Sequence, residues 1–493
     1  MSSPRDLLLA LDAGTGAGRA VLFGTDGRLV AEAYEEWSYR PVDGLPLAQE
    51  FDPEAMWSVF LRLCRRVVEQ AGASSDAILG VSTTSQRGGF VFFDVQGEAL
   101  YGGPNLDQRP LVHPLLHDSD FLARLVRVTG QGLRPARLIT RLLWFKEARP
   151  DLFARVACVL GLNDWLIFKL TGQRRAEPSH ASFTALFDIA RAAWSAELLD
   201  ALGLPQEIFP PVSWPGEVQG GVSEEAALAV GLRPGTPVVT GLGDTQAALL
   251  GCDAVEPGSV VAVAGTTTPL QAVIDRPAIH PTGLTWTACY NEPGRWVIEA
   301  NCGLTGLALR WLRDLFGERD YAFVEQALDE VEPGSGGLFN YLGPRPPGAH
   351  VLAPGWLDEV AVHGTNRAGR GELTRSLCES IAYAVRANLD LLAEMTGSSP
   401  GRLVWTGGMA KNRRLVQLVA TVIGRPVDVC LGEASARGIA ACAAAGAGAA
   451  PDLRTAAERL SAPRETVEPD EAQERVFAPL YQAWSERYHQ HAG

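Results

Sequence analysis

The sequence predicts an α/β fold in which one local architecture occurs twice. An apolar strand, a turn rich in glycine and threonine, and a second apolar strand follow one another at residues 7–23, and the same order returns at residues 259–273. Elsewhere, amphipathic stretches of helical period alternate with short apolar runs of strand length. This alternation is typical of α/β proteins, and the recurring hairpin indicates an internal duplication.

The length of 493 residues predicts at least two domains, because a single core stops growing near ~250–300 residues. A loop with proline and glycine at 252–258 separates the two hairpin patterns. We therefore expect one domain over residues 1–252 and a second over 253–493. Hydrophobic residues make up 46% and charged residues 20% of the chain, as in ordinary globular proteins.

The net charge and the cysteine spacing argue against several classes of binding partner. A net charge of −14 argues against nucleic acid, because neutralising phosphates needs clustered Lys and Arg. The eight cysteines have no CxxC pair and no metal-ligand spacing, which favours reduced, buried thiols. The N-terminal apolar run is broken by Asp12, and no apolar stretch of ~18 residues follows. We expect a cytoplasmic protein with no membrane or nucleic-acid partner.

The first hairpin carries the first candidate site. Asp12 ends a buried strand, so its carboxylate must be hydrogen-bonded or face a cation. Gly14, Thr15 and Gly16 follow in the turn, where bare backbone amides and a hydroxyl can bind phosphate. Together these features suggest a magnesium–nucleotide site, although an ordinary glycine-rich hairpin would share the pattern. The chain continues as a strand after the glycines and has no Gly-Lys-Ser/Thr, which disfavours a Rossmann motif and excludes a P-loop.

The rest of the first half alternates strands and helices. Asp52 and Pro53 predict the start of a helix, as N-cap and first helical residue. A strand from residue 78 runs into the polar turn 86–89, and a polar cluster occupies residues 104–109. The other predicted elements are strands at 29–37, 90–94 and 238–240 and helices at 141–149, 162–171 and 194–202.

The second half continues the alternation. A glycine-rich turn at 303–306 precedes a helix, and a loop rich in glycine and proline spans 334–357. A long amphipathic helix is predicted at 372–394 and an alanine-rich one at 434–450. The strand at 403–406 ends in a glycine pair before another helix.

A second candidate site follows the strand at 238–240. There a Gly-Leu-Gly turn precedes Asp244, Thr245 and Gln246 at the start of an apolar helix. An aspartate in this position often caps the helix and interacts favourably with its dipole. It can also serve as a general base at the mouth of a cleft.

Taken in order, these motifs resemble the FGGY carbohydrate kinases of the actin, hexokinase and Hsp70 ATPase superfamily. The resemblance covers residues 7–485 and rests on four motifs in the same order. It implies two ribonuclease-H-like (actin-like ATPase) domains flanking a cleft, with sugar bound mainly by the first and ATP mainly by the second.

The resemblance also implies roles for individual residues. Asp244 matches the catalytic base, and Asp12 matches the acid that holds Mg²⁺. The implied sugar contacts are Gln86, Arg87, Asn105, Asp107, Asp244, Thr245 and Gln246. The implied ATP contacts are Gly14, Thr15, Gly16, Arg19, Gly265, Thr266, Gly306, Gly408 and Asn412. Arg19 could instead pair with a surface acid. Dimers and tetramers are common in the family, and the resemblance therefore suggests a homodimer.

The implied chemistry suits these residue types. Phosphoryl transfer passes through a loose transition state, so catalysis is mostly positioning and charge stabilisation. Asp244 would accept the proton of the attacking hydroxyl, which contributes ~10²–10⁴ in rate. A nucleotide-dependent chaperone or filament protein on the same fold is the competing class. The Asp244-Thr245-Gln246 and Gln86-Arg87 segments favour the kinase.

Within the family, the opening motif, Glu50-Phe51-Asp52 and the Asn105-x-Asp107-x-Arg109 spacing are most similar to autoinducer-2 kinases. Those enzymes and glycerol kinases carry Arg-Glu in the sugar turn, whereas this chain has Arg87-Gly88; the Met-His pair of xylulokinases is also absent. Without a side chain at Gly88 we expect a roomier pocket. We therefore expect a ketose, pentulose or open-chain polyol as substrate, with the autoinducer-2 precursor as the alternative and glycerol as a poor substrate.

Overall fold

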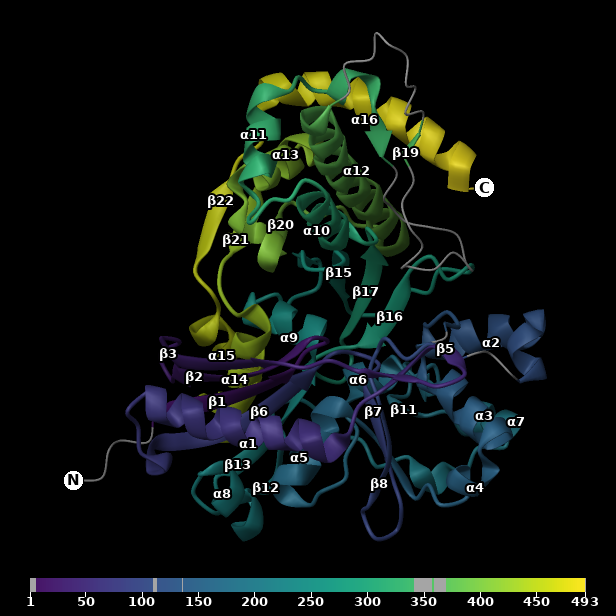
Figure 1. The fold of residues 1–493 in the computed structure, drawn as a ribbon, viewed down its shortest axis with the longest axis vertical. Helices are drawn as coiled ribbons and strands as arrows, with labels where there is room; N and C mark the ends of the chain where they lie inside the picture. Colours follow the sequence, from purple (N-terminus) through teal and green to yellow (C-terminus); the bar gives the residue numbers. More distant parts are fainter. Residues whose placement is uncertain (1–5, 110–112, 135, 341–356, 359–368, 493) are drawn as a thin grey trace.

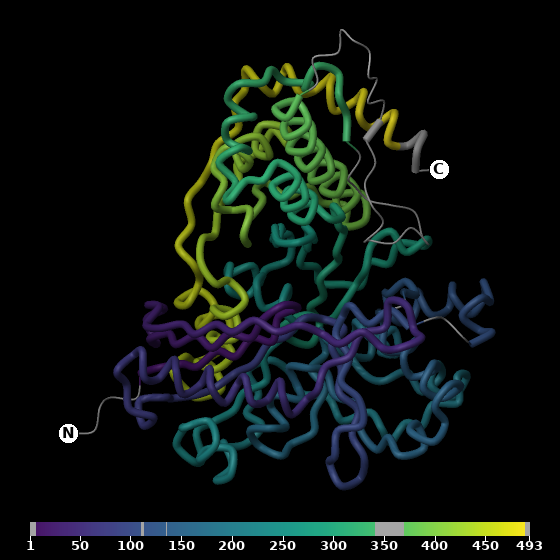
Figure 2. The backbone as a smooth tube through the Cα atoms, viewed as in Figure 1, coloured from purple at the N-terminus to yellow at the C-terminus, as the bar shows by residue number. Residues whose placement is uncertain are grey.

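The computed structural model describes residues 6–109, 113–134, 136–340, 357–358 and 369–492. Two large sheets, each covered by helices, form two bodies that lie one above the other in Figure 1. The backbone trace in Figure 2 starts in the lower body and ends in the upper one. The α/β prediction is confirmed. Of the predicted loop at 334–357, residues 341–356 lie outside the described residues.

The first sheet has six strands, with β1 (Leu7–Ala13) antiparallel to β2 (Ala17–Gly24) and parallel to β6 (Ile78–Ser85). Its full order is β12 (Val218–Gly221), β13 (Pro237–Gly243), β6, β1, β2 and β3 (Leu29–Glu36). Alternate residues of β1 enter different cores: Leu9 packs with the helix on one face, and Leu8 with the helices on the other. Helices on both faces explain why this strand is continuously apolar.

The second sheet repeats the arrangement with seven strands. Here β14 (Val260–Val263) is antiparallel to β15 (Pro269–Ile274) and parallel to β20 (Leu403–Thr406), as β1 is to β2 and β6. The order is β16 (Trp286–Cys289), β17 (Trp296–Asn301), β15, β14, β20, β21 (Val427–Cys430) and β22 (Arg464–Val467). The duplication predicted from the two hairpins is therefore present in the strand topology.

Helix α1 (Pro53–Gln70) starts as its sequence predicts. The carboxylate of Asp52 accepts hydrogen bonds from the amides of Glu54 and Ala55, and Pro53 is the first helical residue. Met56, Phe60 and Leu63 lie on the buried face of α1, toward the first sheet. This face fixes one side of β1 and β2.

The opposite face of the first sheet is covered by a helix from the second half of the chain. Helix α14 (Ala434–Gly446) packs on β1, β6, β13 and α9 (Asp244–Gly251), as Figure 1 shows. A Cβ on Gly438 would lie 1.9 Å from the carbonyl oxygen of Ala247, so glycine permits this close helix pairing. Residues 434–446 therefore pack against the first sheet although they lie in the second half of the chain.

The remaining helices are α2 (Ser119–Thr129), α3 (Leu138–Ala148), α4 (Pro150–Phe153), α5 (Leu162–Thr171), α6 (Pro178–Ser182), α7 (Ala196–Leu202), α8 (Glu224–Val230), α10 (Thr305–Leu315), α11 (Ala322–Glu330), α12 (Arg370–Thr396), α13 (Arg413–Ile423), α15 (Leu453–Leu460) and α16 (Glu471–Ala492). The small strands are β4 (Arg40–Val42), β5 (Leu45–Glu50), β7 (Phe90–Phe93), β8 (Ala99–Gly103), β9 (Cys158–Gly161), β10 (Phe187–Asp188), β11 (Ala193–Trp194), β18 (Phe339–Asn340) and β19 (Leu357–Asp358). Within the described part of the chain, no helix is both long and apolar enough to span a membrane.

Candidate active site

The site forms where three parallel strands of the first sheet end together. Ala13 at the end of β1 pairs with Ser85 of β6, and Gly243 at the end of β13 pairs with the same Ser85. The residues next to these ends are Asp12, Arg87 and Asp244, so one sheet edge gathers two acids and a guanidinium. Ligand sites in α/β sheets commonly lie at the carboxyl ends of strands.

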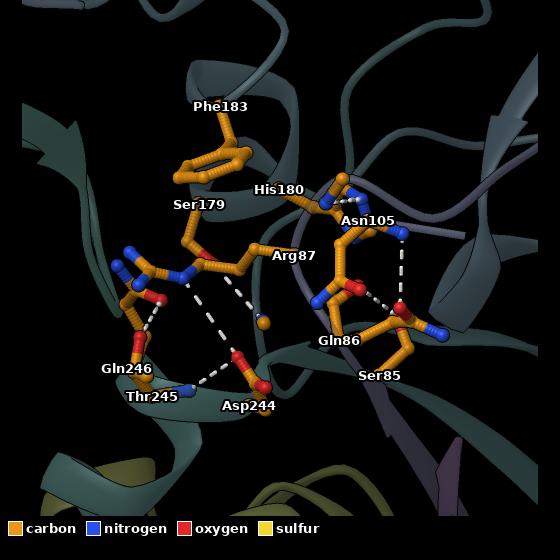
Figure 3. Close-up of polar contacts among 12 residues, drawn as sticks. Ser85, Gln86, Arg87, Asn105, Ser179, His180, Phe183, Asp244, Thr245 and Gln246 are labelled. Carbon is orange, nitrogen blue, oxygen red and sulfur yellow. Dashed lines mark hydrogen bonds and ion pairs between the residues drawn. The ribbon is translucent and has the colours of Figure 1, made fainter. Parts of the chain in front are cut away.

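Asp244 lies at this edge as the first residue of α9. Its carboxylate accepts a hydrogen bond from the amide of Thr245 at 2.8 Å and lies 3.7 Å from Nε of Arg87 (Figure 3). About a third of the side chain, 34%, is exposed. Burial raises the pKa of Asp244 above its usual range, although Arg87 opposes this. A partly exposed carboxylate with a raised pKa can accept a proton from a bound hydroxyl.

Arg87 is held by an acid from the second domain. Its Nη1 and Nη2 atoms bond the two oxygens of Glu299 on β17 at 2.6 and 3.1 Å. Gln271, opposite Glu299 on β15, donates to the same carboxylate at 2.6 Å and to the hydroxyl of Thr245 at 3.0 Å. Sequence analysis missed Glu299 and Gln271, although Glu299 is a single charged residue in an apolar strand, which is a usable signal.

Two of the expected sugar contacts have other partners. Gln86 is fully buried; its amide donates to the carbonyl of Gly14 and the hydroxyl of Tyr39 and accepts from the amide of Asn105. It braces the first phosphate turn from behind. Asn105 lies closer to the surface and donates to the hydroxyl of Thr15 at 3.0 Å.

The structure corrects the expectation for Asp107. This carboxylate is fully buried and accepts from Tyr101, from Nε of Arg109 at 2.9 Å and from the amide of Gln49 at 3.1 Å. Both oxygens are therefore occupied inside the domain. The motif spacing was similar to that of the family, but burial beside two arginines gives Asp107 a structural role.

The turn at Gly88 lies beside Phe183 and Asn105. Gly88 has φ +87°, and a Cβ there would lie within ordinary contact distance, 3.4–3.5 Å, of Ala136, Phe183 and Asn105. The ring of Phe183 lies 4.9 Å from the guanidinium of Arg87 (Figure 3). The roomier pocket expected from the missing side chain stays a prediction.

Helix α6 packs behind the strand end that carries Asp244 and hydrogen-bonds to it. Gly243, immediately before Asp244, donates its amide to the hydroxyl of Ser179 at 3.0 Å. That hydroxyl in turn donates to Glu177 at 2.6 Å, and burial raises the pKa of Glu177 to about 7. Thr245 donates to the buried Gln246 at 3.0 Å, while Nε2 of Gln246 has no hydrogen-bond partner in the part of the chain that the structure describes.

The second domain contains a pocket of about 680 Å³ beside its glycine- and threonine-rich turn at residues 265–268. Gly265, Thr266, Gly306, Gly408 and Asn412 all line it, together with Tyr321 and Lys411, which sequence analysis did not single out. A cavity of this size suits a nucleotide.

Asp12 fits a cation site. Its Oδ1 atom is buried and has no hydrogen-bond partner among the described residues, and burial together with Asp244 raises the pKa of Asp12 to about 7. An orphaned carboxylate oxygen of this kind is stabilised by a metal ion. Among the described residues no group of three or more His, Cys, Asp or Glu could hold a metal by itself, so the remaining ligands would be water and phosphate oxygens.

The phosphate-turn residue Arg19 has a protein partner. Its guanidinium pairs with Glu433, just before α14, and lies 5.4 Å from the ring of Tyr34. Arg19 therefore forms an ion pair with an acid, the second of the two roles that the sequence suggested for it. Gly14, Thr15 and Gly16 remain at the open turn, with Thr15 and Gly16 exposed.

Comparison with known proteins gives one family over most of the chain. Residues 7–251 match the N-terminal domain, and residues 260–447 the C-terminal domain, of the FGGY family of carbohydrate kinases. The chain is 31% identical over 511 aligned residues to an autoinducer-2 kinase of Escherichia coli K12, covering 100% of this chain and 96% of that protein. Solved structures with the same fold include a xylulose kinase from Rhodospirillum rubrum, 25% identical with a TM-score of 0.85 and 98% coverage of each chain. A gluconate kinase from Lactobacillus acidophilus is 20% identical with a TM-score of 0.87, covering 99% of this chain and 98% of that one.

Proposed function

Because the chain belongs to the FGGY family of carbohydrate kinases and is an ATP-dependent sugar kinase, we propose that Asp244 is its general base and that the acceptor is a ketose or an open-chain polyol. The observation that carries the proposal is the position of Asp244: partly exposed, with a raised pKa, at the strand edge that Arg87 shares. The pocket of the second domain would hold ATP.

In the proposed reaction, the acceptor hydroxyl lies against Asp244 and gives its proton to the carboxylate as its oxygen bonds the γ-phosphorus of ATP. The bond from that phosphorus to the β–γ bridging oxygen breaks, and ADP leaves with the electron pair. Arg87, fixed by Glu299, donates to the oxygens of the sugar. The amides of the turns at Gly14 and Gly265 would bind the phosphates. Asp12 would hold Mg²⁺ through water, and the ion would neutralise charge on the transferred phosphoryl group.

A second candidate acceptor is the autoinducer-2 precursor. It is favoured by the relatedness over the whole length to the autoinducer-2 kinase of E. coli. The sugar turn does not decide between the two acceptors, because Gly88 offers no side chain to either of them. A direct assay is therefore needed.

The test is ADP release with a panel of pentuloses, polyols, glycerol and the autoinducer-2 precursor, followed by analysis of the phosphorylated product. We expect one ketose or open-chain compound to stimulate turnover strongly and Asp244→Asn to abolish it while nucleotide affinity stays nearly intact. If no compound stimulated ADP release, the proposed acceptor class would be refuted. If Asp244→Asn kept wild-type turnover at saturating sugar, Asp244 would be only a helix cap.

We also propose that the enzyme works in the cytoplasm and forms a homodimer. Light scattering of the purified chain tests the second point, and a monomeric mass at micromolar concentration would contradict it.

A further inference from the structure

We propose that Glu299, contributed by the second domain, is a positioning residue of the sugar site that supplies the carboxylate missing from the Arg87-Gly88 turn. It acts through Arg87 and does not touch the substrate. The proposal rests on the proposed role of Asp244 as base, and it adds a determinant that lies outside the first domain.

Arg87 and Glu299 form a buried, bidentate ion pair. Glu299 binds Arg87 through both oxygens at 2.6 and 3.1 Å, and their side chains are only 2% and 11% exposed. A bidentate arginine–carboxylate pair fixes the plane of the guanidinium as well as its position. The remaining edge of Arg87, its Nε, lies 3.7 Å from Asp244. Arg87 is therefore held between an acid of each domain.

A second link joins the same carboxylate to the base. Gln271 is buried directly opposite Glu299 in the sheet and bonds both Glu299 and the hydroxyl of Thr245. Thr245 is the residue after Asp244, and its amide bonds the Asp244 carboxylate. Glu299 is thus connected to Asp244 in two ways, through Arg87 and through Gln271 with Thr245.

The first domain offers no substitute for this acid. A carboxylate at position 88 would start from a backbone with φ +87° and would meet Phe183 and Asn105. Arg134 and Arg137 lie near the pair, and burial lowers the pKa of both, of Arg134 to about 10. Glu299 is therefore the acid that balances a cluster of arginines at this place.

The charges facing Asp244 predict what loss of Glu299 does. They are Arg87 after β6, Glu299 on β17 and Asp12 on β1. Replacing Glu299 by glutamine removes a negative charge near Asp244. It also removes the carboxylate that shares the positive charge of Arg87 with Asp244. Both changes favour the ionised base, so its pKa falls.

The experiment compares wild type, Glu299→Gln and Glu299→Asp on the best sugar of the panel across pH 4–9. We expect Glu299→Gln to lower kcat/KM by ~10²-fold, because the guanidinium of Arg87 stays beside Asp244 but is no longer held in one plane toward the sugar. The acid limb of kcat/KM should move down by about one pH unit. Glu299→Asp keeps the charge, so the limb should stay near its wild-type position while the rate falls.

Glu379→Gln is the matched control. Glu379 forms a buried pair with Arg375 at 2.8 Å within α12, away from the cleft, and the two side chains are 3% and 7% exposed. Loss of the Glu379 carboxylate should lower the melting temperature but leave the acid limb of the kcat/KM profile at its wild-type pH. If Glu299→Gln behaved like this control, with an unmoved limb and unchanged kcat/KM, Glu299 would be merely structural and the proposal would be overturned.

A readout without turnover separates this proposal from the proposed function. In protein labelled with ¹³C at the aspartate carboxyls, the signal that disappears in Asp244→Asn reports the titration of Asp244. Its midpoint should fall in Glu299→Gln even if no sugar of the panel is phosphorylated. An unchanged midpoint overturns the role of Glu299, whereas a panel without ADP release overturns only the acceptor class.

Discussion

The backbone amide of Gly88 donates a hydrogen bond to Nε2 of His180 at 3.3 Å. The other ring nitrogen, Nδ1, lies 2.7 Å from Oδ1 of Asn163, an acceptor, so Nδ1 carries the proton and the tautomer is fixed. Burial, with Arg87 and Arg141 nearby, lowers the pKa of His180 to about 3. A neutral imidazole therefore holds the turn that carries Arg87 at every physiological pH.

His180→Phe should lower kcat/KM for the sugar about tenfold or more, since a buried amide left without an acceptor costs ~1–3 kcal/mol. Steady-state kinetics on the best acceptor measure this. His117→Phe, at an exposed position, is the control and should change nothing. In the wild-type enzyme, the pH profile of kcat/KM should show no inflection from His180 between pH 5 and 8, because its pKa lies near 3. Wild-type kinetics in His180→Phe would show that the turn needs no support from the ring.

Mg²⁺ binding should strengthen as pH rises. The ion binds the ionised form of Asp12, whose pKa is raised to about 7, so binding below that pH must release a proton. We expect the apparent Kd of Mg²⁺ in the presence of ADP to fall up to tenfold per pH unit below pH 7 and to level off above it. Calorimetry at pH 5.5, 6.5 and 8 measures the effect. Asp12→Asn should bind weakly with no such dependence, and a wild-type Kd independent of pH would contradict the assignment.

Gly306→Val should weaken nucleotide binding selectively. A Cβ at this position would lie 2.1 Å from the carbonyl oxygen of Gly265, so the start of α10 and the second phosphate turn would be forced apart. We expect at least a tenfold loss of ADP affinity, with sugar affinity retained, in calorimetric titrations. Gly401→Val is the control, because no atom lies within 4 Å of a Cβ there. Equal ADP affinities in the two variants would show that the close approach of Gly306 to the Gly265 carbonyl does not matter for nucleotide binding.

Arg87→Ala should do more than raise KM. Loss of a hydroxyl contact far from the transferred phosphoryl group raises KM, since such a contact contributes similarly to ground and transition states. In the structure the variant also leaves Glu299 buried without its counter-charge, which costs ~3–5 kcal/mol of stability. Loss of the arginine charge further raises the pKa of Asp244, so kcat at pH 6 should fall as well.

The double variant Arg87→Ala/Glu299→Gln separates these effects. It removes the unpaired charge, so its melting temperature should recover toward that of wild type while KM stays high. Thermal unfolding and kinetics on both variants test this. Equal melting temperatures for the single and double variants would mean that the cost of the buried charge is negligible.

The fold class, the duplication and the position of the candidate base could all be predicted from the order of the residues. These depend on patterns between near neighbours: apolar periodicity for strands and helices, Asp52 and Pro53 for the start of α1, and glycines for the phosphate turns. Asp244 could be singled out because a strand, a tight turn and a helix start adjoin it in the chain. Each of these features involves short-range geometry that residue type decides.

The tertiary structure alone decided which polar side chains face one another. Arg87 and Glu299 are 212 residues apart, and no local pattern links them. Gln86 and Asp107 matched a sugar-binding motif, yet the fold buries them and gives their polar atoms internal partners. The physical reason is that a buried polar group takes whatever partner the packed chain brings within hydrogen-bond distance, and packing between distant segments is not encoded in the spacing of neighbours.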